Sequence, residues 1–276
     1  MTGEPLLGPT TAPDLSVMGY NIRRLLPRPL SWGGDRWPVR APLLARLLAD
    51  ESPAVLGLQE ALPQQTEFVV RALGPRYRAV GVGRGAHGGG EACPVVYDSA
   101  RLELLDWRQL ALSGTPATPG SRSWGNPVPR VVVVARLRDR ATGAALRVVN
   151  THFDPFSARS RLLSARLISG LLAAERVPTV MSCDANDRPD SACYRELVGT
   201  GALADAWHTA DRLLTPEWNT YSGYRKPVAG GRRIDWLLVG DGVRVRAAGI
   251  NSRRFGGAAA SDHEPVQALV RLPTGV

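Results

Sequence analysis

The chain has 276 residues, of which 44% are hydrophobic and 21% are charged. This composition is typical of a globular protein and excludes a largely disordered or fibrous chain. No apolar run approaches the roughly 20 residues that cross a bilayer, so we expect no membrane partner. The formal net charge of +9 favours a polyanionic partner such as nucleic acid. Lys226 is the single lysine, however, and scattered arginines are also typical of GC-rich codon usage, so charge alone leaves the partner open.

The chain begins with residues 1–14, a segment rich in proline, glycine and threonine that we expect to be a flexible lead. This segment lacks the basic start and apolar core of a signal peptide, so we expect a cytoplasmic protein. No linker and no repeat of roughly 20 to 50 residues divides the remainder. We therefore expect residues 15–276 to form a single domain, and the protein to be a monomer. Three cysteines without a CxxC pair predict reduced thiols: Cys93, Cys183 and Cys193.

Short apolar runs bounded by Gly, Pro or Asp predict a chain dominated by strands. Apolar stripes at helical spacing predict long helices only at Val39 to Asp50 and Ser157 to Arg176, with a shorter one at Ala192 to Val198. The Thr142-Gly143 pair predicts a hairpin turn. Many strands with few helices favour a layered α/β domain with two packed sheets. The predicted strands cover residues 16–22, 54–60, 77–83, 93–97, 101–107, 130–137, 145–153, 179–184, 234–240, 243–250 and 265–272.

Polar residues follow or precede many of these strands. One such residue indicates little, because chains often become polar where a strand leaves the core. Together they supply carboxylates, amides and two imidazoles at strand ends. Carboxylate and amide oxygens are ligands that suit Mg²⁺ or Mn²⁺, and Mg²⁺ needs only one or two protein carboxylates besides water and substrate phosphate. The residues are Asn21, Glu60, Asn150, His152, Asp184, Asn186, Asp235, Asp262 and His263.

Six ordered segments resemble the motifs of the endonuclease/exonuclease/phosphatase superfamily, which has the DNase I-like fold. They are "MGYNIR", "GLQEA", "RVVNTHFD", "CDAND", "RRIDWLLVG" and "SDHEPV". The resemblance runs from about Ser16 to Leu272, and the connecting loops are similar to a bacterial subgroup related to the deadenylase and nocturnin-like branch. It implies a four-layer α/β sandwich, in which helices flank two central sheets and the site lies at one end of the sheets.

The resemblance also implies metal-ligand roles. Glu60 matches the principal metal ligand of the family, and Asn21 and Asp262 match residues that complete the metal and phosphate environment. The implied cofactor is Mg²⁺ or Mn²⁺.

Five further residues match the family's catalytic positions. Asp184 matches the acid that orients or deprotonates the attacking water, and Asn186 matches the amide that holds a phosphate oxygen or that acid. His263 matches a general base or phosphate ligand, which Asp235 orients. His152 matches the histidine that stabilises the phosphorane. Attack on an anionic phosphate requires such donors and a cation.

Candidate substrate contacts come from the subgroup and from residue type. Arg130 could clamp a phosphate, although an exposed arginine at the start of a strand is the alternative. Glu91 matches a position in the subgroup. Trp124 and Tyr221 could stack on a base or sugar, but burial is the commoner fate of an aromatic side chain.

We therefore predict a Mg²⁺- or Mn²⁺-dependent phosphoesterase whose substrate is nucleic acid, a nucleotide or a small phosphorylated metabolite. The motifs do not separate nuclease from phosphatase, because one catalytic set serves both. The alternative is a catalytically silent binding module, which would normally lose part of the catalytic set. Here the catalytic set is intact, and two other features depart from the family pattern. Cys183 and Ala185 replace the Gly and Phe of "GDFN", and Pro155 follows Asp154 where the subgroup commonly has His.

Overall fold

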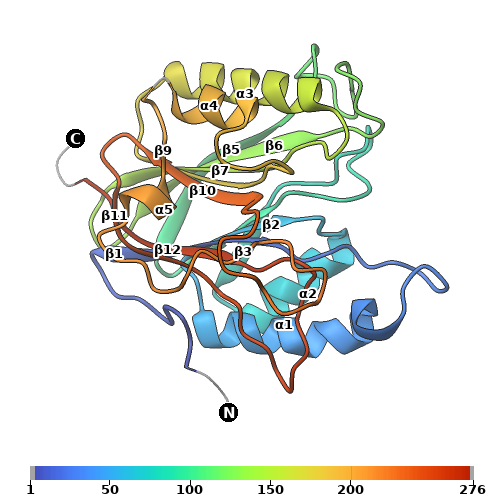
Figure 1. The fold of residues 1–276 in the computed structure, drawn as a ribbon. Coiled ribbons are helices and arrows are strands. Elements are labelled where there is room, and N and C mark those ends of the chain that lie inside the picture. Colours follow the sequence, from blue (N-terminus) through green and yellow to red (C-terminus); the bar gives the residue numbers. More distant parts are fainter. Residues whose placement is uncertain (1–3, 200, 274–276) are drawn as a thin grey trace.

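Two six-stranded sheets lie face to face, with helices on both outer faces (Figure 1). The structure is a computed structural model that describes residues 4–199 and 201–273. Helices α1 (Trp37–Glu51) and α2 (Pro63–Leu73) cover one sheet, and α3 (Ala158–Ala173) and α4 (Ala192–Val198) cover the other. The predicted four-layer α/β sandwich is confirmed.

The first sheet has the strand order β11-β12-β1-β2-β4-β3, and the second β5-β6-β7-β8-β10-β9. Each sheet contains one parallel pair, β1 with β2 and β7 with β8, while the other neighbours are antiparallel. The strands are β1 (Asp14–Asn21), β2 (Val55–Gln59), β3 (Tyr77–Val80), β4 (Val95–Asp98), β5 (Leu102–Ala111), β6 (Val131–Asp139), β7 (Ala145–His152), β8 (Thr179–Asp184), β9 (Ala204–Asp205), β10 (Asp235–Gly240), β11 (Arg244–Ile250) and β12 (Val266–Arg271).

The core forms three layers, because strands buried on both faces carry apolar side chains without interruption. In β6, Val133, Ala135 and Leu137 face the opposite sheet. The alternating residues Val132 and Val134 instead pack beneath α3 and α4. The period of two along a strand therefore explains why the "VVVVARL" run is apolar almost throughout. The predicted β6–β7 hairpin is also confirmed, with Gly143 in the left-handed region at φ 77°.

The prediction of only two long helices is wrong, because α2 was missed. Pro63 occupies the first turn of α2, where its missing N–H costs nothing. The fully enclosed residues of α2 are Val69 and the polar Gln65. Gln65 accepts the backbone N–H of Leu25 at 2.8 Å and donates to the carbonyl of Arg23 at 3.0 Å. Phe68, Val69 and Leu73 nevertheless give α2 a short apolar stripe at helical spacing, which the sequence prediction overlooked. The short elements β9, α5 (Ala206–Thr209) and the 3₁₀ turn Gly33–Asp35 were also missed.

The segment that precedes β1 contacts the body of the protein through Glu51, the last residue of α1. The carboxylate of Glu51 accepts the backbone N–H groups of Leu6, Leu7 and Gly8 at 2.7, 3.1 and 3.2 Å. The division of the chain at residue 14 stays a prediction. Among the described helices, none has the length and apolar character of a membrane span.

Candidate active site

The predicted site residues lie at one end of the two sheets because of strand direction. The parallel pairs β1–β2 and β7–β8 end there, and β10 begins there because it runs antiparallel to β8. In the strand register, Asp184 lies beside His152 on β7 and opposite Asp235 on β10. The loop before β12 adds Asp262 and His263. The structure therefore brings together residues that are up to 242 positions apart in the sequence: Asn21, Glu60, His152, Asp184, Asn186, Asp235, Asp262 and His263.

Asp184 lies at the centre of this group, and its side chain is almost completely buried. Its Oδ2 atom accepts a hydrogen bond from Nδ2 of Asn21 at 2.8 Å. The Nε2 atoms of His152 and His263 lie 3.4 and 3.9 Å from the same oxygen. The backbone N–H of Asn186 donates to Oδ1 at 3.1 Å, which fixes the carboxylate plane. Asp184 is thus in contact with donors from both sheets.

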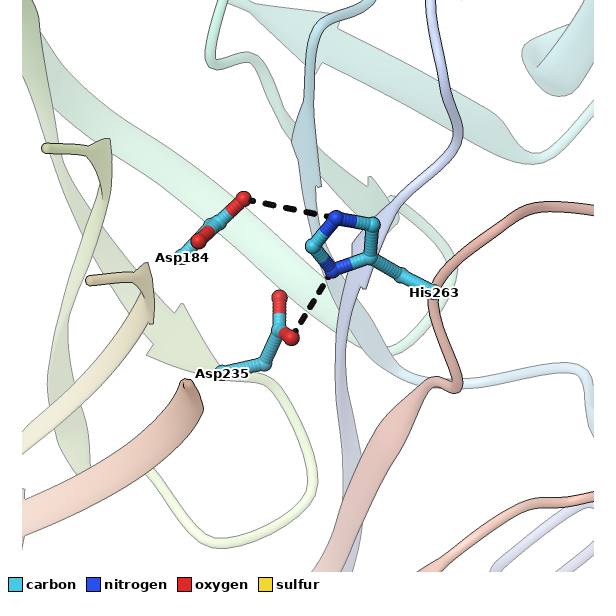
Figure 2. Close-up of side chains that lie close together, drawn as sticks. All are labelled: Asp184, Asp235 and His263. Carbon is cyan, nitrogen blue, oxygen red and sulfur yellow. Dashed lines mark hydrogen bonds and ion pairs between the residues drawn. The ribbon is translucent and has the colours of Figure 1, made fainter. Parts of the chain in front are cut away.

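Asp235, His263 and Asp184 form a chain of acid, base and acid (Figure 2). Nδ1 of His263 lies 2.9 Å from Oδ2 of Asp235 and donates its proton there, because a carboxylate only accepts. Burial would lower the pKa of His263, but Asp235 and then Asp184 raise it well above its ordinary value. Burial, together with the charge of Asp235, raises the pKa of Asp184 to about 7. Asp184 is therefore suited to exchange a proton near neutral pH, beside an imidazole whose protonated form is favoured.

Glu60 directly follows β2 and has a φ of 59°, which is strained for a residue other than glycine. Its carboxylate accepts Nδ2 of Asn21 and the backbone N–H of Arg24, each at 3.1 Å. Burial would raise the pKa of Glu60, but these two hydrogen bonds and the charge of His263 lower it overall. Glu60 is therefore ionised at neutral pH, as a metal ligand must be.

Asp262 is the second carboxylate beside Glu60. Ser261 Oγ donates to its Oδ1 at 3.2 Å, and Nε of Arg23 lies 3.7 Å from its Oδ2. Burial and the negative charge of Glu60 raise the pKa of Asp262. Two neighbouring carboxylates, one buried and one half-buried, repel each other and are stabilised by a cation, and hard oxygen donors suit Mg²⁺ or Mn²⁺. Asp184, Asp235 and His263 offer a second set of ligand atoms, all within 4.8 Å of one another.

Asn21 presents its amide nitrogen, not its oxygen, to the carboxylates of Glu60 and Asp184. Its Oδ1 atom accepts the backbone N–H of Arg23 at 2.9 Å. In this arrangement Asn21 bridges two acids as a donor. The sequence grouped Asn21 with the metal ligands. In the structure its amide donates to the carboxylates of Glu60 and Asp184, and the metal role stays a prediction.

His152 and Asn186 form a neutral pair. Nδ2 of Asn186 donates to Nε2 of His152 at 2.9 Å and to the carbonyl of Phe153 at 3.0 Å. Because Nε2 accepts this bond, the proton of the neutral ring lies on Nδ1. Burial lowers the pKa of His152 well below its usual value, and the guanidinium groups of Arg130 and Arg84 lower it further.

Tyr221 lies at the mouth of the site. Its ring packs edge-on against His263, with centroids 5.1 Å apart, and the side chain is 52% exposed. Together with Asn186 it lines a pocket of about 470 Å³, whose other walls include Pro155 and Arg232. This pocket directly adjoins the catalytic group, since Asn186 and Tyr221 contact both.

The other predicted substrate contacts lie deeper. Arg130 is buried, and its Nε atom lies 3.5 Å from Oδ2 of Asp154. Nε and Nη1 of Arg130 have no hydrogen-bond partner among the described residues. Glu91 accepts Nη1 of Arg24 at 2.9 Å and forms an ion pair with Arg84 at 3.0 Å. Trp124 packs partly against the core beneath α3 and does not line the 470 Å³ pocket.

Besides Arg23, which lies beside Asp262, the sequence prediction missed two more arginines near the site. Arg24 connects Glu60, through its backbone, to Glu91, through its side chain. Arg84 lies on the 81–90 loop and pairs with the same Glu91. Arg24 carries a weak signal, since it stands three residues after Asn21 in "NIRR". Arg84 carries none, because its place depends on how a glycine-rich loop folds back.

Comparison with known proteins gives a consistent result. The sequence matches the endonuclease/exonuclease/phosphatase family over residues 18–263. An endonuclease/exonuclease/phosphatase from Bacteroides vulgatus is 29% identical, with a TM-score of 0.86 over 94% of this chain and 99% of that one. A mannosyl-6-phosphatase from Bacteroides thetaiotaomicron is 24% identical, with a TM-score of 0.86 over 94% and 100%. The human nocturnin catalytic domain is 17% identical, with a TM-score of 0.71 over 98% and 99%. No curated protein sequence matches the chain.

Proposed function

The chain belongs to the endonuclease/exonuclease/phosphatase family, and from that premise we propose that it hydrolyses a phosphate ester by metal-assisted attack of water. The observation that carries this proposal is the position of Asp184. Its carboxylate is buried, held by Asn21 and the backbone of Asn186, and flanked by His152 and His263. A carboxylate whose pKa is raised to about 7 is suited to exchange a proton at neutral pH.

We assign the cation to Glu60 and Asp262. Both are carboxylates, and their mutual repulsion accounts in part for the raised pKa of Asp262. When bound, Mg²⁺ or Mn²⁺ would offset the negative charge of the phosphate and polarise its oxygens. Asn21 keeps the carboxylate of Glu60 in place through its amide donor.

Asp184 and His263 handle the attacking water in this proposal. Asp184 accepts a proton from the water, and Asn21 fixes the direction in which its Oδ2 points. Asp235 holds the His263 ring through Nδ1, so that Nε2 faces Asp184. The same acid favours the protonated ring, which places positive charge beside the incoming phosphate.

His152 contacts a phosphoryl oxygen in this proposal, and Asn186 positions its ring, because both protons of the Asn186 amide go to His152 and to the carbonyl of Phe153. The neutral His152 ring adds a donor without adding a charge, and Asn186 is tied to it at 2.9 Å. Positioned donors of this kind stabilise the charge that develops on the phosphoryl oxygens in the transition state.

The pocket beside Tyr221 favours a small, ring-bearing substrate. Its volume of about 470 Å³ lies within the usual range of small-molecule sites. The pocket suits a sugar or nucleoside as the leaving group of the phosphate ester. Its walls offer the exposed ring of Tyr221, the amides of Asn186 and Asn219, and the guanidinium of Arg232. Nucleic acid is the second candidate substrate, and the net charge of +9 favours it.

The test is hydrolysis of mono- and bis-p-nitrophenyl phosphate, followed by a panel of sugar phosphates, nucleotides and single-stranded oligonucleotides. We expect turnover that requires Mg²⁺ or Mn²⁺, stops with a chelator and is lost in Asp184→Ala. Absence of turnover on every substrate, with the fold intact by circular dichroism, would instead support a binding module.

A further inference from the structure

A second polar pocket, of about 480 Å³, lies at the other end of the strands that carry the catalytic group. In β7, Arg147 faces this pocket and His152 lies at the opposite end of the strand. In β8, Thr179 and Asp184 are arranged in the same way. Since a strand rises about 3.3 Å per residue, the two sites are roughly 17 Å apart. The pocket is therefore distinct from the catalytic site, although β7, β8 and β10 run from one to the other.

Arg147 is the central feature of this pocket, and its side chain is only 6% exposed. Nε donates to Oγ1 of Thr179 at 3.0 Å, and Nη2 donates to the carbonyl of Leu172 in the last turn of α3 at 3.4 Å. These two bonds attach the end of α3 to the sheet. Nε and Nη2 of Arg147 therefore have a structural role. Nη1 makes no hydrogen bond with any described residue. Unlike Nε and Nη1 of Arg130, which are buried without a partner, it is accessible to solvent.

The charge of Arg147 is only weakly balanced. The nearest carboxylate oxygen, Oδ2 of Asp241, lies 3.8 Å from Nη2, which is well beyond a charge-assisted hydrogen bond. A second arginine, Arg176, also lines the pocket, is exposed and forms no ion pair within the described ranges. The lining of the pocket thus includes two guanidinium groups and one carboxylate, that of Asp241, which forms a long ion pair with Arg147.

Nη1 of Arg147 and the guanidinium of Arg176 are thus donors that a ligand in this pocket can reach. Planar guanidinium groups match the oxygens of phosphate and carboxylate in a bidentate manner. We propose that this pocket binds a small oxyanion, a phosphate or carboxylate group of a metabolite, between Nη1 of Arg147 and Arg176. The carboxylate of Asp241 repels an anion, so a ligand must bind on the Nη1 side of Arg147 or push the Asp241 side chain away.

Inorganic phosphate and acetate are the two probes, added separately to the full-length protein and measured by titration calorimetry and by soaking crystals. We expect an anion at Arg147 in soaked crystals, in addition to any at the catalytic site. Arg176→Gln should weaken this binding about tenfold while leaving the unliganded melting temperature unchanged, since the side chain is exposed. Arg71→Gln, an exposed arginine on α2, is the control and should bind as the wild type does.

The two probes distinguish the ligand class. Stronger binding of phosphate at this pocket identifies a phosphate-bearing ligand, and stronger binding of acetate identifies a carboxylate. Anion density confined to the catalytic site, or an Arg176→Gln titration identical to that of the wild type, would overturn the proposal. Because the readout is binding at Arg147, failure of the proposed catalytic activity would not affect it.

Discussion

Nδ1 of His263 lies 2.9 Å from Oδ2 of Asp235, and both side chains are buried. One oxygen of Asp235 is thus committed to the ring, while its Oδ1 atom has no partner among the described residues. The pair connects two strands of different sheets, because Asp235 begins β10 and His263 precedes β12. The interaction therefore determines the direction in which the imidazole faces Asp184.

Asp235→Asn should reduce kcat about 100-fold, because it removes the charge that orients and protonates His263. His263→Gln should cost at least as much. The double variant should be little worse than His263→Gln, since the two residues act as one unit. Steady-state kinetics of the three variants provide the test, with Asp211→Asn at the surface as the control. Fully additive losses would show that Asp235 acts independently of His263.

Gly57 allows the two sheets to approach each other next to the site. A Cβ at this position would lie 2.8 Å from Oδ1 of Asn150 and from the side chain of Ser182. These groups belong to a buried polar bridge between the sheets, in which Gln59 donates to Asn150 at 2.7 Å and to Ser182 at 3.1 Å. The bridge fixes the distance between Glu60 on one sheet and Asp184 on the other.

Gly57→Ala should therefore destabilise the protein by about 2 kcal/mol, which is typical of overpacking, and should also reduce activity. Gly170→Ala is the matched control. It lies in α3, a Cβ there meets nothing within 4 Å, and replacing a helical glycine should stabilise by about 0.5–1 kcal/mol. Urea unfolding compares the two. Equal stability of Gly57→Ala and the wild type would show that the sheets can separate at no cost.

The strand ends were predictable from the sequence because apolar runs of strand length stop at Asn21, Glu60 and Asp184. Their convergence could be predicted only through the family resemblance, since spacing in the sequence does not give the order of strands in a sheet. Helix α2 was overlooked although Phe68, Val69 and Leu73 recur at helical spacing, because the first turn after Pro63 is polar and the apolar stripe is short.

The details of hydrogen bonding were also beyond the sequence. The amide of Asn21 faces two carboxylates only because β1 lies beside β2 and across from β8. Tyr221 could be proposed as a substrate contact from residue type, but so could Trp124, which packs against the core. Tyr221 is 52% exposed and Trp124 is partly buried, a difference that belongs to the folded chain, and both substrate contacts stay predictions.

Asp139 predicts an acid-sensitive contribution to stability away from the site. Arg101 binds its carboxylate with two bonds, at 2.6 and 2.9 Å, and the β6–β7 turn adds the backbone of Ala141 and the hydroxyl of Thr142. Burial would raise the pKa of Asp139, but these donors lower it overall. A depressed pKa stabilises the folded state above the unfolded pKa of about 3.9, and the contribution is lost as the pH falls through the folded value.

Asp139→Asn should therefore cost about 3 kcal/mol at neutral pH, the usual effect of breaking a buried pair, and progressively less below about pH 4. The exposed Asp106, which pairs with Arg136, is the control, and Asp106→Asn should change stability by less than about 1 kcal/mol. Chemical unfolding at a series of pH values gives the comparison. A pH-independent loss in Asp139→Asn would contradict the linkage.

Metal binding at Glu60 can be tested without measuring activity. A cation that binds only the folded state raises the melting temperature with its concentration, by mass action. The wild type, stripped with a chelator, should therefore melt higher as Mg²⁺ or Mn²⁺ is added.

Glu60→Gln should lose most of this shift, because an amide is a weaker and uncharged ligand and because Glu60 is ionised in the folded protein. Without metal the variant should be slightly less stable than the wild type, because two hydrogen bonds and the charge of His263 favour the ionised Glu60 and lower its pKa. Glu67→Gln, at an exposed position on α2, should keep the full shift. If Glu60→Gln kept the full increase in melting temperature, the cation would instead be assigned to the second set of ligand atoms, those of Asp184, Asp235 and His263.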